Sequence, residues 1–204
     1  IMKIICIGRN YLDHISELNN DIPTEPIFFM KQENALCKKN QPFFLPDFSE
    51  EIHYEAELVI KIAKVGKTIP KKYALDFIDS ITVGIDFTAR DLQRKCIEQG
   101  LPWEISKAFD FSAPMGTFIP ISNFADLKNI HFSLLKNDVL VQSGCSGDMI
   151  FFFDEIIHYI SQYITLKTGD VIFTGTPKGI SRVEKGDYLD VFLENEKLLH
   201  KKIL

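Results

Sequence analysis

The segment that most constrains the fold is residues 52–60, because every second side chain in it is apolar. Successive side chains of a β-strand point to opposite faces, so the segment predicts a strand with one face packed in the core. The apolar face consists of Ile52, Tyr54, Ala56, Leu58 and Ile60. On the other face, Glu55 and Glu57 carry like charges two residues apart, which repel unless the face is solvated or a cation lies between them. The function depends on which of these two alternatives holds.

A second alternating segment, residues 81–87, places Asp86 at the end of another strand. Other apolar runs predict short strands at residues 3–7, 27–30, 43–45, 130–135, 139–142, 171–174 and 188–193. Apolar side chains at helical spacing predict helices at residues 11–19, 71–79, 90–99 and 154–163. Gly100 would end the third helix, and Asp154 can cap the fourth. With 204 residues and no repeat or linker, the chain is expected to form one domain, 1–204, of the β-rich α+β class.

Charge and composition argue against several kinds of partner. A net charge of −5 disfavours nucleic acid and anionic membranes. No apolar run reaches the roughly 18 residues of a membrane span, and the first residues do not read as a signal segment. The four cysteines have no C-x-x-C spacing, which is typical of free thiols in a reducing compartment. We therefore expect a cytoplasmic protein without a nucleic-acid or membrane partner.

Three carboxylates on the two alternating strands suggest a metal site. Glu55, Glu57 and Asp86 offer only oxygen ligands, which suit a hard divalent cation such as Mg²⁺, Mn²⁺ or Ca²⁺. Taken alone, a Glu-x-Glu pair is more typical of a solvated strand edge. The apolar content of both strands favours an interior position instead. His53 lies on the same face as the two glutamates, so a zinc or iron site that includes histidine is an alternative.

A second set of polar residues fits acid–base chemistry and substrate binding. His14 and Glu17 lie one helical turn apart, so the carboxylate can orient the imidazole as a general base, although such a pair is most often a surface contact. Arg90 and Gln93 follow Asp86 on a predicted helix, and the alternative for them is an ordinary exposed helix start. Lys107 could bind an anionic substrate or be solvated. The chain has neither a Gly-Lys-Ser/Thr phosphate loop nor a Gly-x-Ser-x-Gly nucleophile motif.

Several motifs occur together in one order along the chain. They are Gly8-Arg9-Asn10-Tyr11, Asp13-His14-Ile15-Ser16-Glu17, His53-Tyr54-Glu55-Ala56-Glu57-Leu58, Asp86-Phe87-Thr88-Ala89-Arg90-Asp91-Leu92-Gln93, Leu101-Pro102-Trp103 with Lys107, and Gly169-Asp170-Val171-Ile172-Phe173-Thr174-Gly175-Thr176-Pro177-Lys178-Gly179. In this set the chain resembles the fumarylacetoacetate hydrolase family, specifically its short, single-domain, acylpyruvase-like members. The resemblance implies a mixed β-sandwich roll that usually forms a homodimer. Lys31-Gln32 departs from the Lys-Pro that is common in relatives.

The resemblance also implies roles for individual residues. The implied metal ligands are Glu55, Glu57 and Asp86, with Mg²⁺ as the expected cation and Mn²⁺ or Ca²⁺ as alternatives. The implied catalytic residues are His14, Glu17 and Lys107, the first two on a segment that orders as a lid in relatives. The implied substrate-binding residues are Arg90, Gln93 and Thr176.

The activity that the resemblance implies is metal-dependent hydrolysis of a carbon–carbon bond in a 2,4-dioxo acid, such as an acylpyruvate or fumarylpyruvate, through a metal-bound pyruvate enolate. The same intermediate would serve an oxaloacetate decarboxylase or tautomerase, or a 2-hydroxyhepta-2,4-diene-1,7-dioate isomerase. The pair His14 and Glu17 favours a hydrolase or decarboxylase over a pure isomerase. An alternative of another class is a non-catalytic binder that kept the scaffold.

Overall fold

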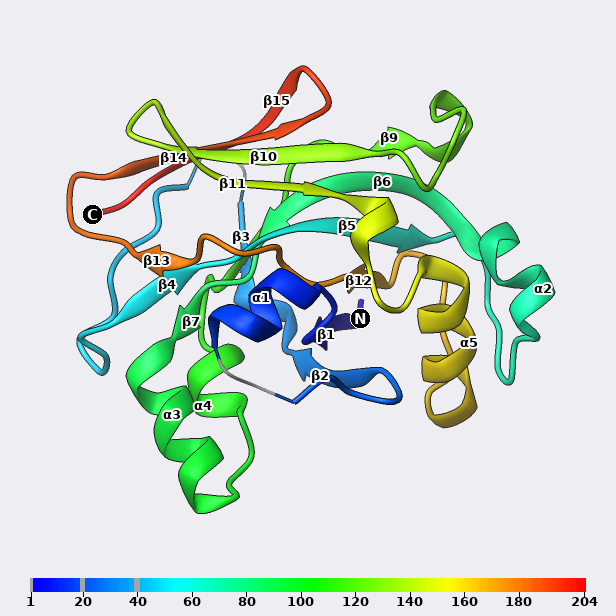
Figure 1. The fold of residues 1–204 in the computed structure, drawn as a ribbon, viewed down its shortest axis with the longest axis horizontal. Coiled ribbons are helices and arrows are strands. Elements are labelled where there is room, and N and C mark those ends of the chain that lie inside the picture. The colour runs from blue at the N-terminus through cyan, green and yellow to red at the C-terminus, as the bar shows by residue number, and fades with distance from the viewer. Residues whose placement is uncertain (1, 19–20, 39–40) are drawn as a thin grey trace.

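The centre of the molecule is a mixed six-stranded sheet in the order β2-β1-β12-β5-β6-β9 (Figure 1). Its strands are β1 (Ile4–Gly8), β2 (Ile27–Lys31), β5 (Ala56–Ile62), β6 (Ile78–Ile85), β9 (Ile119–Pro120) and β12 (Val171–Phe173). The computed structural model describes residues 2–18, 21–38 and 41–204. Strand β1 pairs parallel with β12, and the other pairs are antiparallel. Burial of most side chains of β1, β5, β6 and β12 agrees with the apolar runs that predicted these strands.

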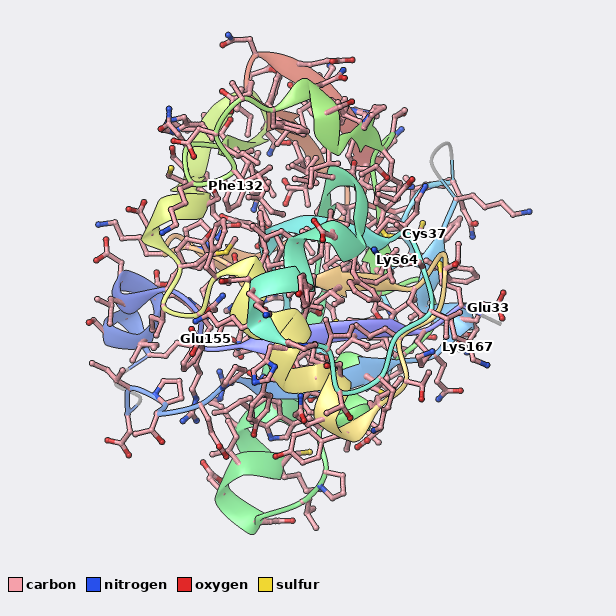
Figure 2. The ribbon with its side chains drawn as sticks, turned by 90° about the vertical axis from the view of Figure 1, so that its right-hand side faces the viewer. Glu33, Cys37, Lys64, Phe132, Glu155 and Lys167 are labelled. Atoms are coloured by element: carbon pink, nitrogen blue, oxygen red, sulfur yellow. The ribbon has the colours of Figure 1, made fainter. Side chains whose placement is uncertain are left out.

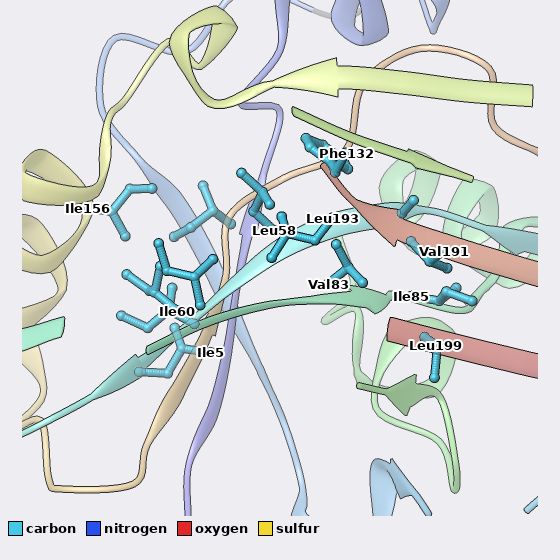
Figure 3. Packing of buried hydrophobic residues seen from close by; sticks show 14 of the residues in the cluster. Ile5, Leu58, Ile60, Val83, Ile85, Phe132, Ile156, Val191, Leu193 and Leu199 are labelled. Carbon is cyan, nitrogen blue, oxygen red and sulfur yellow. The ribbon is translucent and has the colours of Figure 1, made fainter. Parts of the chain in front are cut away.

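A second, antiparallel sheet packs across β5 and β6, in the order β11-β10-β14-β15 (Figure 1). Its strands are β10 (His131–Lys136), β11 (Val139–Cys145), β14 (Tyr188–Leu193) and β15 (Glu196–Lys202). In Figure 3, Leu58 and Val83 of the central sheet lie opposite Val191 and Leu193 of the second sheet, and all four side chains are buried. Each fully buried Val or Leu contributes roughly 1.5–3 kcal/mol relative to exposure. This layer of apolar contacts makes the two sheets a sandwich.

Helices cover the ends of the sandwich. Helices α2 (Lys71–Ala74) and α5 (Phe153–Tyr163) pack together at one end, and α3 (Arg90–Gln99) and α4 (Glu104–Lys107) lie at the other (Figure 1). Helix α1 (Leu12–Glu17) follows β1 directly. The smaller elements are strands β3 (Leu36–Cys37), β4 (Ile52–Tyr54), β7 (Thr88–Ala89), β8 (Ala113–Pro114) and β13 (Ser181–Arg182), and 3₁₀ helices η1 (Glu33–Ala35), η2 (Leu75–Phe77), η3 (Ile121–Asn123) and η4 (Ser146–Asp148). The β-rich α+β class is confirmed.

The predicted continuous strand over residues 52–60 is wrong at one position, Glu55. Strand β4 ends at Tyr54 and belongs to a small sheet with β7 and β13, whereas β5 begins at Ala56 in the central sheet. At this interruption, the carboxylate of Glu55 pairs with buried cations on α3 and α4.

Three other predictions need correction. Residues 71–79 do not form one helix, because α2 ends at Ala74, a 3₁₀ turn follows and β6 begins at Ile78. Residues 43–45 form no strand; Phe43 makes only an isolated bridge with Ile203. Asp154 does not cap α5, because Phe152 occupies the N-cap position and Asp154 lies in the first turn. Helix α1 ends at Glu17, and Asn19, where the predicted helix ended, lies outside the described residues.

The positions of the labelled charged residues and the state of the cysteines are as the sequence predicts. In Figure 2, the labelled charged residues Glu33 and Lys167 lie at the periphery, whereas Phe132 lies within the body of the molecule. All four cysteines are free thiols. Within the described ranges, no helix has the length and apolar character that a membrane crossing needs.

Candidate active site

Three carboxylates meet where the central sheet joins the small sheet. Glu55 lies at the junction of β4 and β5, Glu57 lies on β5, and Asp86 follows β6. The Asp86 N–H donates a 2.8 Å hydrogen bond to the Glu55 carbonyl, which keeps the two strand ends in register. One oxygen atom from each carboxylate lies within 4.8 Å of the other two. The three residues are at most 5% exposed, so the solvated-edge alternative is wrong.

Buried cations surround two of these carboxylates. Lys107 Nζ lies 2.7 Å from Glu55 Oε2, 2.8 Å from Asp86 Oδ2 and 2.6 Å from Thr88 Oγ1. Arg90 pairs with Glu55 and also donates to Gln93 Oε1. Both cations are almost fully buried, which excludes the alternatives of a solvated lysine and an exposed helix start.

Burial and local charge move the pKa values of these groups in opposite directions. Burial raises the pKa of Glu57, and the negative charges of Asp86 and Glu55 raise it further. Burial also disfavours the charged form of Glu55, but Lys107 and Arg90 outweigh this effect and lower its pKa. Burial pushes the pKa of Lys107 down, yet Asp86 and Glu55 bring it above its ordinary value. Glu57 is thus the carboxylate without a cationic partner among the described residues.

This arrangement fits a hard divalent cation. A cation among the three carboxylates would relieve the repulsion that raises the pKa of Glu57. The Oδ1 atom of Asp86 is buried and lies 2.7 Å from Lys31 Nζ, but it accepts no hydrogen bond of good geometry within the described part of the chain. His53 is not part of the cluster: its Nε2 lies 3.0 Å from Glu51 Oε1, and its Nδ1 accepts a 3.4 Å hydrogen bond from Arg90. The geometry therefore supports an oxygen-only site rather than a histidine-containing zinc or iron site.

We expect cation binding to release a proton from Glu57. Because the pKa of this carboxyl is raised, it holds a proton at pH values where an ordinary glutamate is ionised, and the cation must displace that proton. The affinity for Mg²⁺ or Mn²⁺ should therefore rise with pH until the raised pKa is passed. Calorimetric titration in buffers of different ionisation enthalpy measures the protons released. If cation binding released no protons at any pH at which the cation affinity rises, the protonated state of Glu57 would be contradicted.

His14 and Glu17 form a pair beside the carboxylates. His14 Nδ1 lies 3.3 Å from Glu17 Oε2, and Glu17 Oε1 accepts a 3.1 Å hydrogen bond from the Gly179 N–H. His14 is only 7% exposed, so the pair is more than a surface contact. Burial lowers the pKa of His14, and Arg90 lowers it further, against the opposing effects of Glu55 and Glu17. The imidazole is therefore held neutral, as a general base requires.

One small cavity brings the predicted residues together. Its volume is about 60 Å³. Eight of the nine predicted site residues line it, and Glu17 contacts it through His14. The eight are His14, Glu55, Glu57, Asp86, Arg90, Gln93, Lys107 and Thr176. The other lining residues are Ile7, Gly8, Arg9, Leu18, Phe29, Ile97 and Trp103.

Two buried residues that support the site were missed as site residues. Lys31 pairs with Asp86 and donates to Ser112 Oγ at 2.9 Å, which holds the Asp86 side chain from the side opposite Lys107. A lysine directly after the apolar run 27–30 was the available signal for it. Gln142 accepts from the Ala56 N–H and donates to Thr176 Oγ1, both at 2.9 Å. Gln142 lies on a predicted strand, and nothing in the sequence around it indicated a role in the site.

Comparisons with known proteins identify the family. The model of the fumarylacetoacetate (FAA) hydrolase C-terminal family matches residues 3–201. The oxaloacetate tautomerase YcgM of Escherichia coli (strain K12) is 38% identical over 199 residues, which cover 97% of this chain and 91% of the relative. The mitochondrial oxaloacetate tautomerase FAHD1 of Mus musculus is 36% identical over 192 residues, 94% of this chain and 87% of the relative.

A solved structure extends the comparison to bound ligands. The fumarylpyruvate hydrolase of Pseudomonas aeruginosa, in complex with Mn²⁺ and pyruvate, superposes with a TM-score of 0.94 at 34% identity. The match covers 100% of this chain and 90% of that one. From the extent of the family match and the identity to these enzymes, the chain belongs to the fumarylacetoacetate hydrolase family.

Proposed function

We propose that this protein is a divalent-cation-dependent enzyme of small 2-oxo acids whose main reaction is the keto–enol tautomerisation of oxaloacetate. The observation that carries the proposal is a buried imidazole, His14, in the same cavity as three buried carboxylates and two buried cations, and burial lowers the pKa of this imidazole. The names of the E. coli and mouse relatives support oxaloacetate as the substrate.

The proposed binding mode uses the cationic end of the cavity. Glu55, Glu57 and Asp86 would hold a divalent cation, which polarises the 2-oxo group of a bound acid and stabilises negative charge on it. Arg90 and Lys107 supply positive charge beside the substrate's carboxylate, and Gln93 and Thr176 supply hydrogen-bonding groups to its oxygens. These groups are already held in place by mutual hydrogen bonds, so little reorganisation accompanies the reaction.

The proposed proton carrier is His14. Its Nδ1–H donates to Glu17, which leaves the Nε2 lone pair as the base. In the keto-to-enol direction, Nε2 takes a proton from C3 as electrons move into the C2–C3 bond and onto the 2-oxo oxygen, and the imidazolium then delivers that proton to the same oxygen. In the reverse direction, Nε2 takes the enol O–H proton and delivers it to C3. Glu17 stabilises the imidazolium that forms between the two steps, and the Gly179 N–H keeps Glu17 in position.

The second candidate is hydrolysis of a 2,4-dioxo acid, with His14 removing a proton from a water molecule instead of from carbon. The neutral His14 with its Glu17 partner suits this role, and the Pseudomonas structure is named as a fumarylpyruvate hydrolase. Decarboxylation of oxaloacetate is a third reaction that would use the same cationic end of the cavity.

A substrate panel distinguishes these reactions. The metal-loaded protein is incubated separately with oxaloacetate, acetylpyruvate, fumarylpyruvate and 2-hydroxyhepta-2,4-diene-1,7-dioate, and enol absorbance and pyruvate are followed. A tautomerase accelerates the decay of oxaloacetate enol without a matching rise in pyruvate. Pyruvate from the dioxo acids indicates a hydrolase, pyruvate from oxaloacetate a decarboxylase, and turnover of the dioate an isomerase. Binding without turnover of any of them would contradict an enzymatic function.

The pH profile should show the effect of burial on His14. Because burial lowers the pKa of this imidazole, the base stays neutral and active to lower pH than an ordinary histidine. The acid limb of kcat/KM for oxaloacetate is therefore expected below about pH 6.5. Initial rates between pH 5 and pH 8, with the cation saturating at each pH, measure the limb. A midpoint clearly above that of a free histidine would contradict a buried neutral base.

Three further properties belong to the proposal. A small 2-oxo acid is the partner, a homodimer is the assembly, and the cytoplasm is the location. These rest on the family and on the charge and cysteine pattern of the chain.

A further inference from the structure

We propose that Arg9 recognises a second carboxylate on the substrate, so that the cavity selects 2-oxo dicarboxylates over 2-oxo monocarboxylates. This inference rests on the proposed function and adds a specificity residue to it. Arg9 lines the same cavity as the three carboxylates and His14. Its position, its backbone conformation, the charge of the cavity and the lack of a partner for its guanidinium within residues 2–18, 21–38 and 41–204 all support this role.

A series of contacts locates Arg9 relative to the cation site. Lys107 Nζ lies 5.3 Å from the ring centroid of Phe29, and the Phe29 ring meets Trp103 edge-on at 5.8 Å. A Cβ atom built on Gly8 would lie 3.6 Å from the Trp103 ring, and Arg9 is the next residue. The cavity wall thus runs from the cation site, past two aromatic rings, to Arg9. A substrate held by its 2-oxo acid end would extend its other end along this wall.

Among the residues that the structure describes, the guanidinium of Arg9 has no competing partner. The other basic residues of the cavity, Lys107 and Arg90, each pair with a buried carboxylate. In the described ranges, Arg9 takes part in neither an ion pair nor a hydrogen bond. The apolar residues that line the cavity are Ile7, Leu18, Phe29, Ile97 and Trp103. A distal carboxylate placed there would be desolvated and unpaired unless Arg9 binds it, and a bidentate guanidinium–carboxylate pair fits that need.

Arg9 also adopts a backbone conformation that favours glycine. Its φ is 58°, in the left-handed region, where a Cβ atom is strained. The next residue imposes this turn: Asn10 Nδ2 donates to the carbonyls of Phe151 and Thr174 at 3.0 and 2.8 Å, and Asn10 Oδ1 accepts from the Phe151 N–H at 2.7 Å. A glycine would satisfy the turn without strain. The presence of an arginine at this strained position is explained if its guanidinium binds the substrate.

The net charge of the cavity agrees with a dianionic ligand. Lys31, Arg90 and Lys107 balance Glu55, Glu57 and Asp86 when all six are ionised. A divalent cation adds two positive charges, and one substrate carboxylate neutralises only one of them. Arg9 adds a further positive charge at the far end of the wall, so a second carboxylate has both a local partner and a favourable field.

The test compares two ligands of equal length that differ only in the distal group. These are 2-oxoglutarate, a dicarboxylate, and 2-oxopentanoate, which ends in a methyl group. Their dissociation constants are measured calorimetrically with Mg²⁺-loaded protein, for the parent, Arg9→Met and the surface control Arg182→Met. We expect Arg9→Met to weaken 2-oxoglutarate about 10- to 100-fold and 2-oxopentanoate by less than about 3-fold. Arg182→Met should change neither constant, because Arg182 is exposed and outside the cavity.

A third variant separates recognition from a purely structural role. Arg9→Gly removes the guanidinium and the backbone strain together, so it should lose the discrimination as completely as Arg9→Met while unfolding at the same or a higher temperature than Arg9→Met. Equal weakening of both ligands in Arg9→Met, or a parent that binds both equally, would overturn the role of Arg9 and leave the proposed function standing. A parent that binds neither ligand would instead overturn the 2-oxo acid site, and this inference with it.

Discussion

Replacement of His14 by asparagine should lower kcat for oxaloacetate by about 10²- to 10⁴-fold, the usual contribution of a positioned general base. The asparagine amide can still donate to Glu17, so α1 keeps its contact with the loop at Gly179. His14 is not part of the cluster Glu55, Glu57 and Asp86 that would bind the cation, so the Mn²⁺ affinity should stay within about 3-fold of the parent value. The loss should therefore appear in kcat, with a small change in KM.

The matched control is His200→Asn. The His200 side chain is 57% exposed and pairs with Asp190 on the second sheet, away from the cavity. This variant should retain the parent kcat. If His14→Asn turns over oxaloacetate at the parent rate, another group carries the proton, and the role given to Glu17 fails as well. Steady-state kinetics at saturating cation distinguishes the outcomes.

Replacement of Glu57 by glutamine should abolish the cation site without damaging the metal-free fold. Burial and the nearby carboxylates raise the pKa of this carboxyl, which favours its protonated form, and glutamine has nearly the same shape as the protonated acid. Its carbonyl oxygen can accept the 2.7 Å hydrogen bond that the Gly175 N–H donates to Glu57. We expect activity to fall by at least about 10³-fold, because the cation is the main source of electrostatic stabilisation in the proposed reaction.

Thermal unfolding provides the second readout for this variant. Without added cation, Glu57→Gln and the parent should unfold at similar temperatures. With Mn²⁺ at 100 times its dissociation constant, the parent gains about 2.7 kcal/mol of stability by mass action, and the variant gains almost none. The control Glu155→Gln removes an exposed carboxylate paired with Lys71 and should respond to Mn²⁺ like the parent. Stabilisation of Glu57→Gln equal to that of the parent would place the cation elsewhere.

The fold was predictable wherever local pattern and tertiary packing agree. Residues 90–99 have helical spacing and end at Gly100, whose φ of 63° is the left-handed cap expected there. The apolar run at residues 188–193 predicted β14 with its full bounds. In contrast, residues 71–79 carry helical spacing, but only tertiary packing shows that the segment turns at Leu75 and enters the central sheet.

The site was also predictable where the local pattern agrees with the tertiary packing. Residue types and strand positions predicted that Glu55, Glu57 and Asp86 form one metal site. In the structure, the pairing of β5 with β6 brings the three carboxylates together. No local pattern shows that Glu55 interrupts its strand or that its carboxylate pairs with cations from distant helices.

The residues that no pattern singled out are those defined by long-range contacts. Lys31 follows an apolar run, but its role is defined by its contacts with Asp86 and Ser112, which are far away in the chain. Arg9 stood within a quoted motif, but its significance depends on its left-handed backbone and on the absence of a partner in the described structure. Both are properties of the folded chain.

The most direct test of the cation-dependent 2-oxo acid site measures the decay of oxaloacetate enol absorbance by protein stripped of metal and then reloaded. Rates are taken with chelator, with Mg²⁺ or Mn²⁺ added back, and with the same cation in the absence of protein. We predict that the stripped protein gives only the uncatalysed rate and that the reloaded protein exceeds the cation-only rate by at least about 10³-fold. A stripped protein as active as the reloaded one, or a reloaded protein no faster than the cation alone, would contradict the site described above.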